Sequence, residues 1–230
     1  MTVVERRGDR VVRDAGDWTP AVHRLLAHLQ RAGVDGVPVP HGRTDDGREV
    51  LGFLDGEVPH HPVPAWVWTV RALESSARLL RRIHDATEGA SLDGPWRSPT
   101  HEPPEVVCHN DFAPYNLVFE DGVVVGVIDW DFASPGPRLW DLAYLAYRIV
   151  PLTTDDWGDA FPPSVRRERL IQLLRAYGTS AGPADLLAVL RDRLLELADF
   201  SERTADPASR PELREHAQLY RRDAESLLSP

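Results

Sequence analysis

Residues 108–131 read CHNDFAPYNLVFEDGVVVGVIDWD. The pair Asp121-Gly122 separates two apolar runs, and Asp-Gly between such runs is a strong two-residue turn signal. The sequence therefore predicts a β-hairpin at this point. Because a hairpin folds the chain back on itself, we expect Asn116, before the first strand, to lie near Asp129, after the second.

The polar residues around this hairpin have the types and spacing of a kinase catalytic loop. In such loops His-x-Asp is followed by four residues and then Asn, as in His109, Asp111 and Asn116 here. Phosphoryl transfer needs an Asp that accepts the proton of the attacking hydroxyl, and an Asn and a second Asp that hold metal. Asp129 stands where that second Asp is expected. Each residue alone is a weak signal, and the combination is a strong one.

The composition limits the classes of protein to which the chain can belong. It has 230 residues, of which 42% are hydrophobic, and a formal net charge of −10. The apolar content predicts a packed core, and the negative charge argues against a nucleic-acid partner and permits a cationic ligand. No apolar run is long enough to span a membrane, and the first residues are charged. With a single cysteine, Cys108, these features favour a cytoplasmic protein of undetermined oligomeric state.

Apolar periodicity and the positions of Gly and Pro divide the chain into three parts. Residues 1–56 predict a small lobe of short strands and one helix, which begins at Thr19-Pro20. Residues 57–64, rich in Pro and His, predict a linker. Residues 65–230 predict a larger, mostly helical lobe that includes the catalytic loop and the acceptor site. The fold class predicted is α+β.

The chain resembles the aminoglycoside phosphotransferase and choline-kinase-like family. Its signature is His-Gly-Asp followed by Asn and then by Ile-Asp-Trp-Glu or Ile-Asp-Trp-Asp; here Asn110 replaces the Gly. The similarity continues through residues 135–143, PGPRLWDLA, and is most specific from about Ile83 to Tyr147. It implies a protein-kinase-like bilobal fold with a reduced N-lobe sheet and a mostly helical C-lobe.

The resemblance also implies an activity and the roles of several residues. It identifies Asp111 as the catalytic base and Asn116 and Asp129 as Mg²⁺ ligands. The implied reaction moves the γ-phosphoryl group of ATP or GTP to a hydroxyl of a small-molecule acceptor, which is an antibiotic, an aminoalcohol or a sugar. By the same analogy His109 and Asp141 support the loop and take no part in the chemistry.

The small lobe departs from the family pattern. All 26 basic residues are Arg, so Arg13 is the best match to the cation that contacts the nucleotide phosphates. The following helix offers His23 and no acidic partner for that cation. The residues Gly52, Phe53 and Leu54 are predicted to meet an adenine through their backbone.

Acceptor contacts are predicted from an acidic loop between two helices of the large lobe. Asp155, Asp156 and Trp157 would form an aromatic and anionic surface suited to a cationic sugar or amine, and Asp131 is a further candidate. The other interpretation of this loop is a solvated acidic segment.

A second function class stays open. The thin small lobe and the missing Lys are also compatible with a catalytically reduced kinase-like protein that acts in small-molecule binding or self-protection. Mg²⁺-nucleotide binding is the observation that would distinguish the two.

Overall fold

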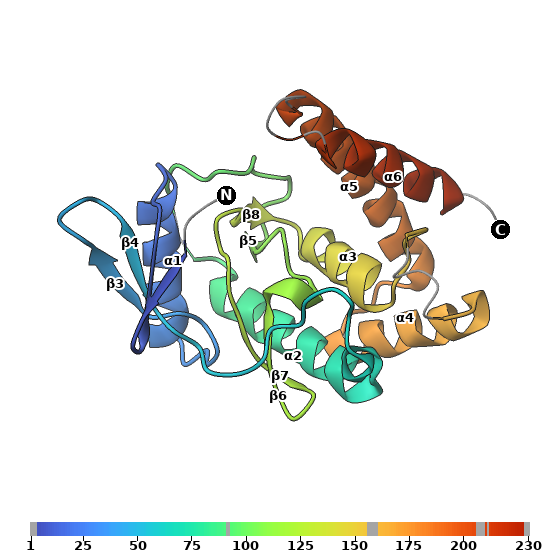
Figure 1. Ribbon diagram of the computed structural model, residues 1–230. Coiled ribbons are helices and arrows are strands. Elements are labelled where there is room, and N and C mark those ends of the chain that lie inside the picture. Colours follow the sequence, from blue (N-terminus) through green and yellow to red (C-terminus); the bar gives the residue numbers. More distant parts are fainter. Residues whose placement is uncertain (1–3, 91–92, 156–160, 206–209, 211, 228–230) are drawn as a thin grey trace.

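The computed structural model describes residues 4–90, 93–155, 161–205, 210 and 212–227. Figure 1 shows a small lobe, in blue, beside a larger lobe of helices. The strands of the described chain are β1 (Glu5–Arg7), β2 (Arg10–Arg13), β3 (Pro40–Arg43), β4 (Glu49–Gly52), β5 (Val106–Cys108), β6 (Leu117–Glu120), β7 (Val123–Val127) and β8 (Ser134–Gly136). The helices are α1 (Thr19–Arg31), α2 (Val70–Thr87), α3 (Arg138–Ile149), α4 (Pro163–Tyr177), α5 (Pro183–Thr204) and α6 (Glu212–Ser226), with single 3-10 turns at Ala65–Trp68 and Pro114–Asn116.

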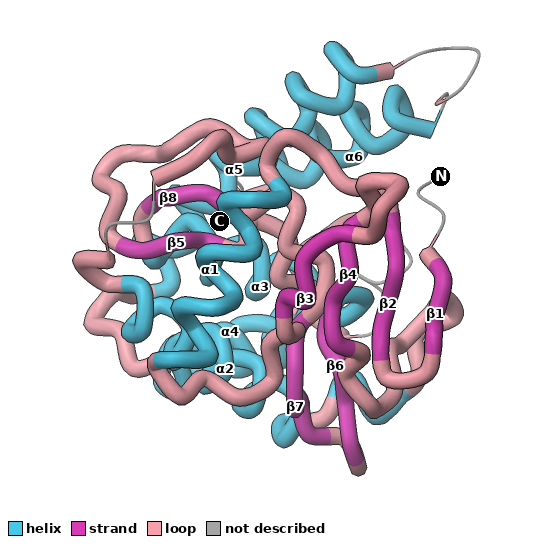
Figure 2. Tube along the Cα trace, turned by 90° about the vertical axis from the view of Figure 1, so that its left-hand side faces the viewer, coloured by secondary structure: helices cyan, strands magenta, loops and turns pink. Residues whose placement is uncertain are grey.

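The small lobe is a four-stranded antiparallel sheet with one helix. Its strand order is β1-β2-β4-β3, and Figure 2 shows these strands side by side. The first hairpin turns at Gly8, where a φ of 66° suits glycine. Helix α1 has a proline in its first turn, as its sequence predicts. Strand β3 was not expected, because its sequence PHGR lacks the β-branched residues that mark strands.

The large lobe consists of helices α2 to α6 and two short ladders, β5 with β8 and β6 with β7. The predicted hairpin is present: β6 and β7 pair antiparallel, with Leu117 opposite Val127 and a turn at Asp121-Gly122. Helices α5 and α6 lie side by side at the end far from the small lobe (Figure 1).

One continuous apolar core joins the two lobes. It includes Leu25 and Leu29 of α1, Leu80 of α2 and Leu142 of α3, all without exposed surface. Burial of such side chains is the main favourable contribution to folding, at about 1.5–3 kcal/mol for each. The small lobe is therefore folded onto the large one by the same force that folds each lobe.

Two backbone contacts fasten the small lobe and the linker to the β6–β7 hairpin. The carbonyl of Gly36 accepts a hydrogen bond from Val127 N at 2.9 Å, and Glu57 exchanges two backbone hydrogen bonds of 2.8 Å with Phe119. Gly36 has a φ of 85°, and a Cβ there would lie 2.1 Å from the carbonyl oxygen of Val125. Only glycine allows the backbone at position 36 to come this close to β7, so the contact depends on this residue type.

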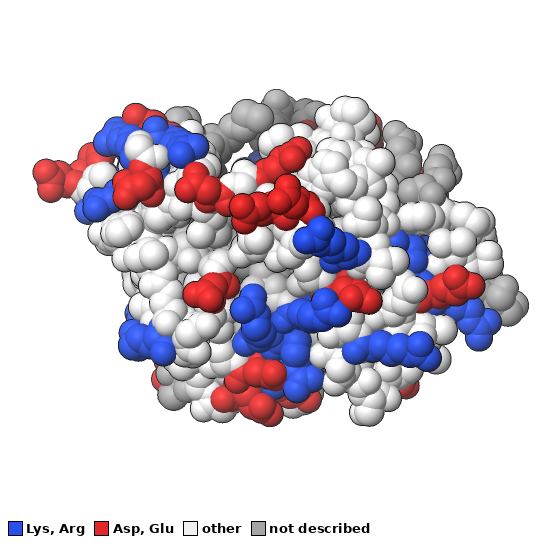
Figure 3. Space-filling model, turned by 90° about the horizontal axis from the view of Figure 1, so that it is seen from below, with Lys and Arg blue, Asp and Glu red and all other residues white. Residues whose placement is uncertain are grey.

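Charged side chains of both signs lie next to one another on the face that Figure 3 shows. Helix α2 carries such pairs, for example Glu74 with Arg78 at 2.6 Å and Arg81 with Asp85 at 2.7 Å. Exposed pairs of this kind contribute little to stability, on the order of 0–1 kcal/mol.

Candidate active site

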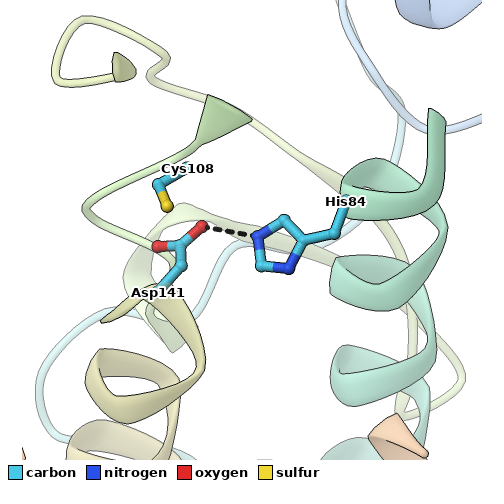
Figure 4. A group of neighbouring side chains, drawn as sticks. All are labelled: His84, Cys108 and Asp141. Atoms are coloured by element: carbon cyan, nitrogen blue, oxygen red, sulfur yellow. Dashed lines mark hydrogen bonds and ion pairs between the residues drawn. The ribbon is translucent and has the colours of Figure 1, made fainter. Parts of the chain in front are cut away.

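A buried carboxylate accepts hydrogen bonds from the backbone of the loop that follows β5. Asp141, in the first turn of α3, accepts hydrogen bonds from the backbone N–H groups of His109 at 2.7 Å and Asn110 at 3.0 Å. Its third partner is the Nε2 atom of His84 at 3.2 Å (Figure 4). Burial acts to raise the pKa of Asp141, but the hydrogen bond and charge of His84, with the charges of His109 and Arg193, lower it overall. Asp141 is therefore an ionised support for the loop.

Cys108 lies beside this pair, and Figure 4 shows its sulfur turned toward Asp141. The potential ligand atoms of His84, Cys108 and Asp141 lie within 4.8 Å of one another, a separation that a metal ion could bridge. Burial raises the pKa of the Cys108 thiol well above its usual range, and the thiol donates to the carbonyl of Pro137 at 3.4 Å. Hydrogen bonds within the protein therefore account for the positions of all three side chains.

The loop turns sharply at Asn110, whose φ is 64°. Asn is one of the few residues other than Gly that adopt this left-handed conformation readily, which explains how it can stand where the family pattern has Gly. Its side-chain amide donates to the carbonyl of Phe132 at 2.9 Å and to the Ser134 hydroxyl at 2.8 Å. The turn is thus fixed on both sides before the chain reaches Asp111.

Asp111 is oriented by two neighbours from the same loop. The Tyr115 hydroxyl donates to its Oδ1 at 2.6 Å, and the Asn116 amide donates to its Oδ2 at 2.8 Å. Burial, with the nearby charge of Asp129, raises the pKa of Asp111 to about 6, although the bonds from Tyr115 and Asn116 oppose the rise. A carboxylate with a raised pKa is a better proton acceptor near neutral pH.

The hairpin brings Asn116 and Asp129 together. The backbone carbonyl of Asn116 accepts a hydrogen bond from Ile128 N at 2.9 Å, directly before Asp129. Asp129 itself has a φ of 60°, a conformation that costs energy for any residue with a side chain and is concentrated at functional sites.

The donor set at this point suits Mg²⁺. The Asn116 amide nitrogen donates both of its hydrogen bonds to Asp111. The Oδ1 atom of Asn116 accepts no hydrogen bond from the described part of the chain. The Asp129 carboxylate is 45% exposed. Amide and carboxylate oxygens are the ligands that Mg²⁺ prefers, so the residues fit the ion that the fold implies.

Arg13 reaches the same carboxylates from the small lobe. Its Nη1 lies 3.1 Å from Asp129 Oδ1 and its Nη2 2.5 Å from Asp131 Oδ1, while its Nε donates to Glu49 Oε2 at 2.5 Å. Burial of the guanidinium acts to lower its pKa, but these three carboxylates raise it overall, so the side chain is charged.

Glu49 is an acidic partner that the sequence analysis did not identify. It stands directly opposite Arg13 in the β2–β4 ladder, and its other oxygen is 2.9 Å from His23 Nε2. The partner of the cation therefore lies on β4, and α1 supplies only the histidine. The available signal was a charged residue at the start of the otherwise apolar segment Glu49–Gly52.

The residues predicted to meet adenine lie at the end of β4 and directly after it. Two of their N–H groups are already bonded within the protein: Gly52 N donates to Val39 O at 2.7 Å, and Phe53 N to Asp9 O at 2.8 Å. Leu54 is half-buried, and the Phe53 ring lies 3.6 Å from the Arg6 guanidinium carbon. Adenine recognition at these residues stays a prediction.

Of the residues predicted to contact the acceptor, the structure describes Asp131 and Asp155. Asp131 is paired with Arg13 and lies 3.6 Å from Arg97, and Asp155 lies 3.4 Å from Arg148. Asp156 and Trp157 lie outside the described residues.

A pocket of about 590 Å³ opens beside Asp111, and neither Asp131 nor Asp155 lines it. Its walls come from the catalytic loop, from residues 97–101, and from α3, α5 and α6. Arg193 of α5 is a lining residue that the sequence analysis missed; it is buried and donates to the Asn110 carbonyl at 2.5 Å. Arg193 lies on the leucine-rich face of its helix, with Leu190 and Leu194. A charged residue at a position where the pattern predicts an apolar one was the available signal.

None of the helices in the described ranges is long and apolar enough to cross a membrane.

Comparison with known proteins identifies relatives of the chain and supports the fold. Residues 90–186 match the phosphotransferase enzyme family, known as APH. The chain is 33% identical over 234 residues to a trifolitoxin immunity protein of Rhizobium leguminosarum bv. trifolii, covering 95% of this chain and 86% of that protein.

Solved structures share the fold at low sequence identity. A choline/ethanolamine kinase family protein from Mesorhizobium loti aligns with a TM-score of 0.65 at 18% identity, over 100% of this chain and 85% of the other. A spectinomycin phosphotransferase in complex with ADP and spectinomycin aligns with a TM-score of 0.67 at 12% identity, over 98% and 89%. A macrolide 2′-phosphotransferase from Brachybacterium faecium gives 0.60 at 16%, over 100% and 89%. These similarities confirm the predicted α+β, protein-kinase-like fold.

Proposed function

We propose that this chain, which belongs to the phosphotransferase enzyme family, transfers the γ-phosphoryl group of ATP or GTP to a hydroxyl of a small molecule with the help of Mg²⁺. The observation that carries the proposal is the arrangement of Asp111, Asn116 and Asp129 around one hairpin, with Arg13 facing them. A base, two metal-ligating oxygens and a phosphate-binding cation are the parts that phosphoryl transfer needs.

In the proposed reaction the acceptor hydroxyl oxygen forms a bond to the γ-phosphorus. The bond from that phosphorus to the bridging oxygen breaks, and the nucleoside diphosphate leaves with the electron pair. Asp111 orients the hydroxyl and takes its proton, for which its pKa of about 6 is suited. Asn116 and Asp129 would hold Mg²⁺, which when bound neutralises charge on the phosphates.

Arg13 has the position for a contact with the nucleotide phosphates. It is anchored by Glu49 through Nε, so its two terminal nitrogens are directed to the side on which Asp129 and Asp131 lie. An Arg fork binds phosphate oxygens in pairs, and this geometry compensates for the lack of a Lys.

Antibiotics, aminoalcohols and sugars are the proposed acceptor classes, and antibiotic resistance in the cytoplasm is the proposed role. The similarity to a protein named for immunity to trifolitoxin fits a protective function. The same similarity also favours the second candidate, a catalytically reduced kinase-like protein that protects by binding alone.

Two substitutions separate these candidates and test the roles. Asp111→Asn keeps an oxygen that can accept from Tyr115 or Asn116, so Mg²⁺-nucleotide binding should be nearly unchanged while turnover falls by about 10²–10⁴-fold. Asp129→Ala should lose nucleotide binding and turnover together. Binding is measured by calorimetry, and turnover by nucleotide consumption with a panel of aminoglycosides, macrolides, aminoalcohols and sugars.

Full turnover by the Asp111→Asn protein on its best acceptor would refute the assignment of the base. If the unmodified protein binds no Mg²⁺-nucleotide, the binding-protein candidate replaces the kinase.

A further inference from the structure

The pocket beside Asp111 contains more free positive charge than free negative charge in its described lining. Three arginines line it, Arg97, Arg193 and Arg203, against two carboxylates, Asp111 and Glu196. A pocket for a polycationic acceptor requires the opposite balance, because each ammonium group that leaves water needs an anionic or polar partner.

Both carboxylates already have partners. Each oxygen of Asp111 accepts a hydrogen bond within the loop. Both oxygens of Glu196 lie near His101 Nε2, at 2.9 and 3.1 Å, and this hydrogen bond is the main reason that the pKa of Glu196 is lowered. An incoming ammonium group would compete with these partners for the same oxygens.

Two of the arginines, in contrast, form no direct ion pair in the described part of the chain, although their charges help to lower the pKa of Glu196. In the described part of the chain no carboxylate lies within ion-pair distance of Arg193 or Arg203. Arg193 is buried and lies against the rings of Trp140 and Tyr144. Among the described residues, its hydrogen bonds go to the neutral carbonyl and amide oxygens of Asn110. Arg203 is exposed at the pocket rim and forms no hydrogen bond to another described residue.

Aromatic rings form another part of the lining. Tyr115, Phe132, Phe200 and Tyr220 line the pocket with Leu197, and Phe200 is 40% exposed. Phe132 and Phe200 meet edge to face, with ring centroids 6.3 Å apart. Such surfaces bind the apolar part of a ligand, and the cavity volume is in the range of pockets that hold drug-sized molecules.

From these observations we infer that the acceptor is an anionic, amphipathic hydroxy acid, with a carboxylate for the arginines, an apolar or aromatic body for the rings, and a hydroxyl that reaches Asp111. The inference rests on the proposed function only in assigning the hydroxyl as the phosphoryl acceptor. The charge preference follows from the pocket itself and can be tested without nucleotide.

The test uses ligands that share one skeleton and differ in charge: 3-hydroxy-4-phenylbutanoate, its primary amide and the corresponding amine. Their binding to the full chain is measured by calorimetry without nucleotide. The carboxylate should bind about tenfold or more tightly than the amide, and the amine more weakly than either. A carboxylate that binds no more tightly than the amine, or does not bind at all, overturns the inference.

A pair of charge reversals on α5 locates the effect. Arg203→Glu should remove the preference for the carboxylate over the amide, whereas Arg191→Glu, on the same helix but outside the pocket, should keep it. An unchanged preference in Arg203→Glu would overturn the inference.

Adding MgATP then separates the two claims. If the protein binds the carboxylate selectively and binds nucleotide but transfers no phosphate to any hydroxyl ligand, the proposed function fails and the charge inference stands. If it phosphorylates amines and ignores carboxylates, the proposed function stands and the charge inference fails.

Discussion

Replacing Arg13 by Met should cost the protein much of its stability. The Arg13 side chain is 10% exposed and Glu49 is 1% exposed, so the substitution leaves a buried carboxylate whose remaining close partner is His23. It also removes the cation between Asp129 and Asp131. Breaking a buried ion pair by removing one partner costs about 3–5 kcal/mol. For a chain of this size that loss corresponds to a fall in Tm of roughly 6–20 °C.

The assay is urea unfolding without Mg²⁺ or nucleotide, applied to a double-mutant cycle. Glu49→Gln in the Arg13→Met background replaces the stranded charge by a neutral amide, and it should recover at least half of the lost free energy of unfolding. Arg10→Met on the same strand is the control, because Arg10 is exposed, and it should change stability by no more than about 0.5 kcal/mol. A loss below about 1 kcal/mol for Arg13→Met, or a coupling energy with Glu49 near zero, would refute the reasoning.

Two further predictions concern the fold around the site. Asp141→Asn should lower the free energy of unfolding at pH 7 by about 2–4 kcal/mol, because two backbone N–H groups and His84 lose an ionised acceptor. The pKa of Asp141 in the folded protein lies below its ordinary value of 3.8, so its stabilising effect is complete above that pH and is lost as the pH falls through the lower folded value. Urea unfolding from pH 7 to pH 3 should therefore show the difference between the variant and the unmodified protein becoming smaller below about pH 4, and a constant difference would contradict the assignment. Gly36→Ala should destabilise the protein by about 1–2 kcal/mol for its positive φ plus the cost of moving the Val125 carbonyl, whereas Gly47→Ala, with the same φ of 85° and nothing within 4 Å of the new Cβ, should show the first cost alone. Equal losses in thermal unfolding would show that the Gly36 contact is not tight.

The sequence predicts this site where the information is local. The spacing from His109 to Asn116 and the Asp121-Gly122 turn each lie within a few residues, and together they bring Asn116 close to Asp129 through local structure alone. The fold class follows from the same segment by resemblance.

The residues that the sequence analysis missed depend on contacts between distant segments. Glu49 meets Arg13 only because β4 inserts between β2 and β3, an order that no local pattern contains. Arg193 enters the pocket because α5 packs against the Asn110 turn, which lies 83 positions away in the chain. The sheet order and the helix packing angle arise from the whole core, and the periodicity of one segment does not specify them.

The backbone contacts of the small lobe and the linker with the hairpin limit how the molecule can move. In a kinase whose lobes are connected only through a flexible linker, the lobes can rotate apart about that hinge. Here Gly36 is bonded to Val127, two residues before Asp129, and Glu57 is bonded to Phe119 on the neighbouring strand. A rotation of the small lobe must therefore carry the hairpin with it or break those bonds. We expect ligand exchange to proceed mainly by local rearrangement of side chains around the site, with little change in the overall radius of gyration.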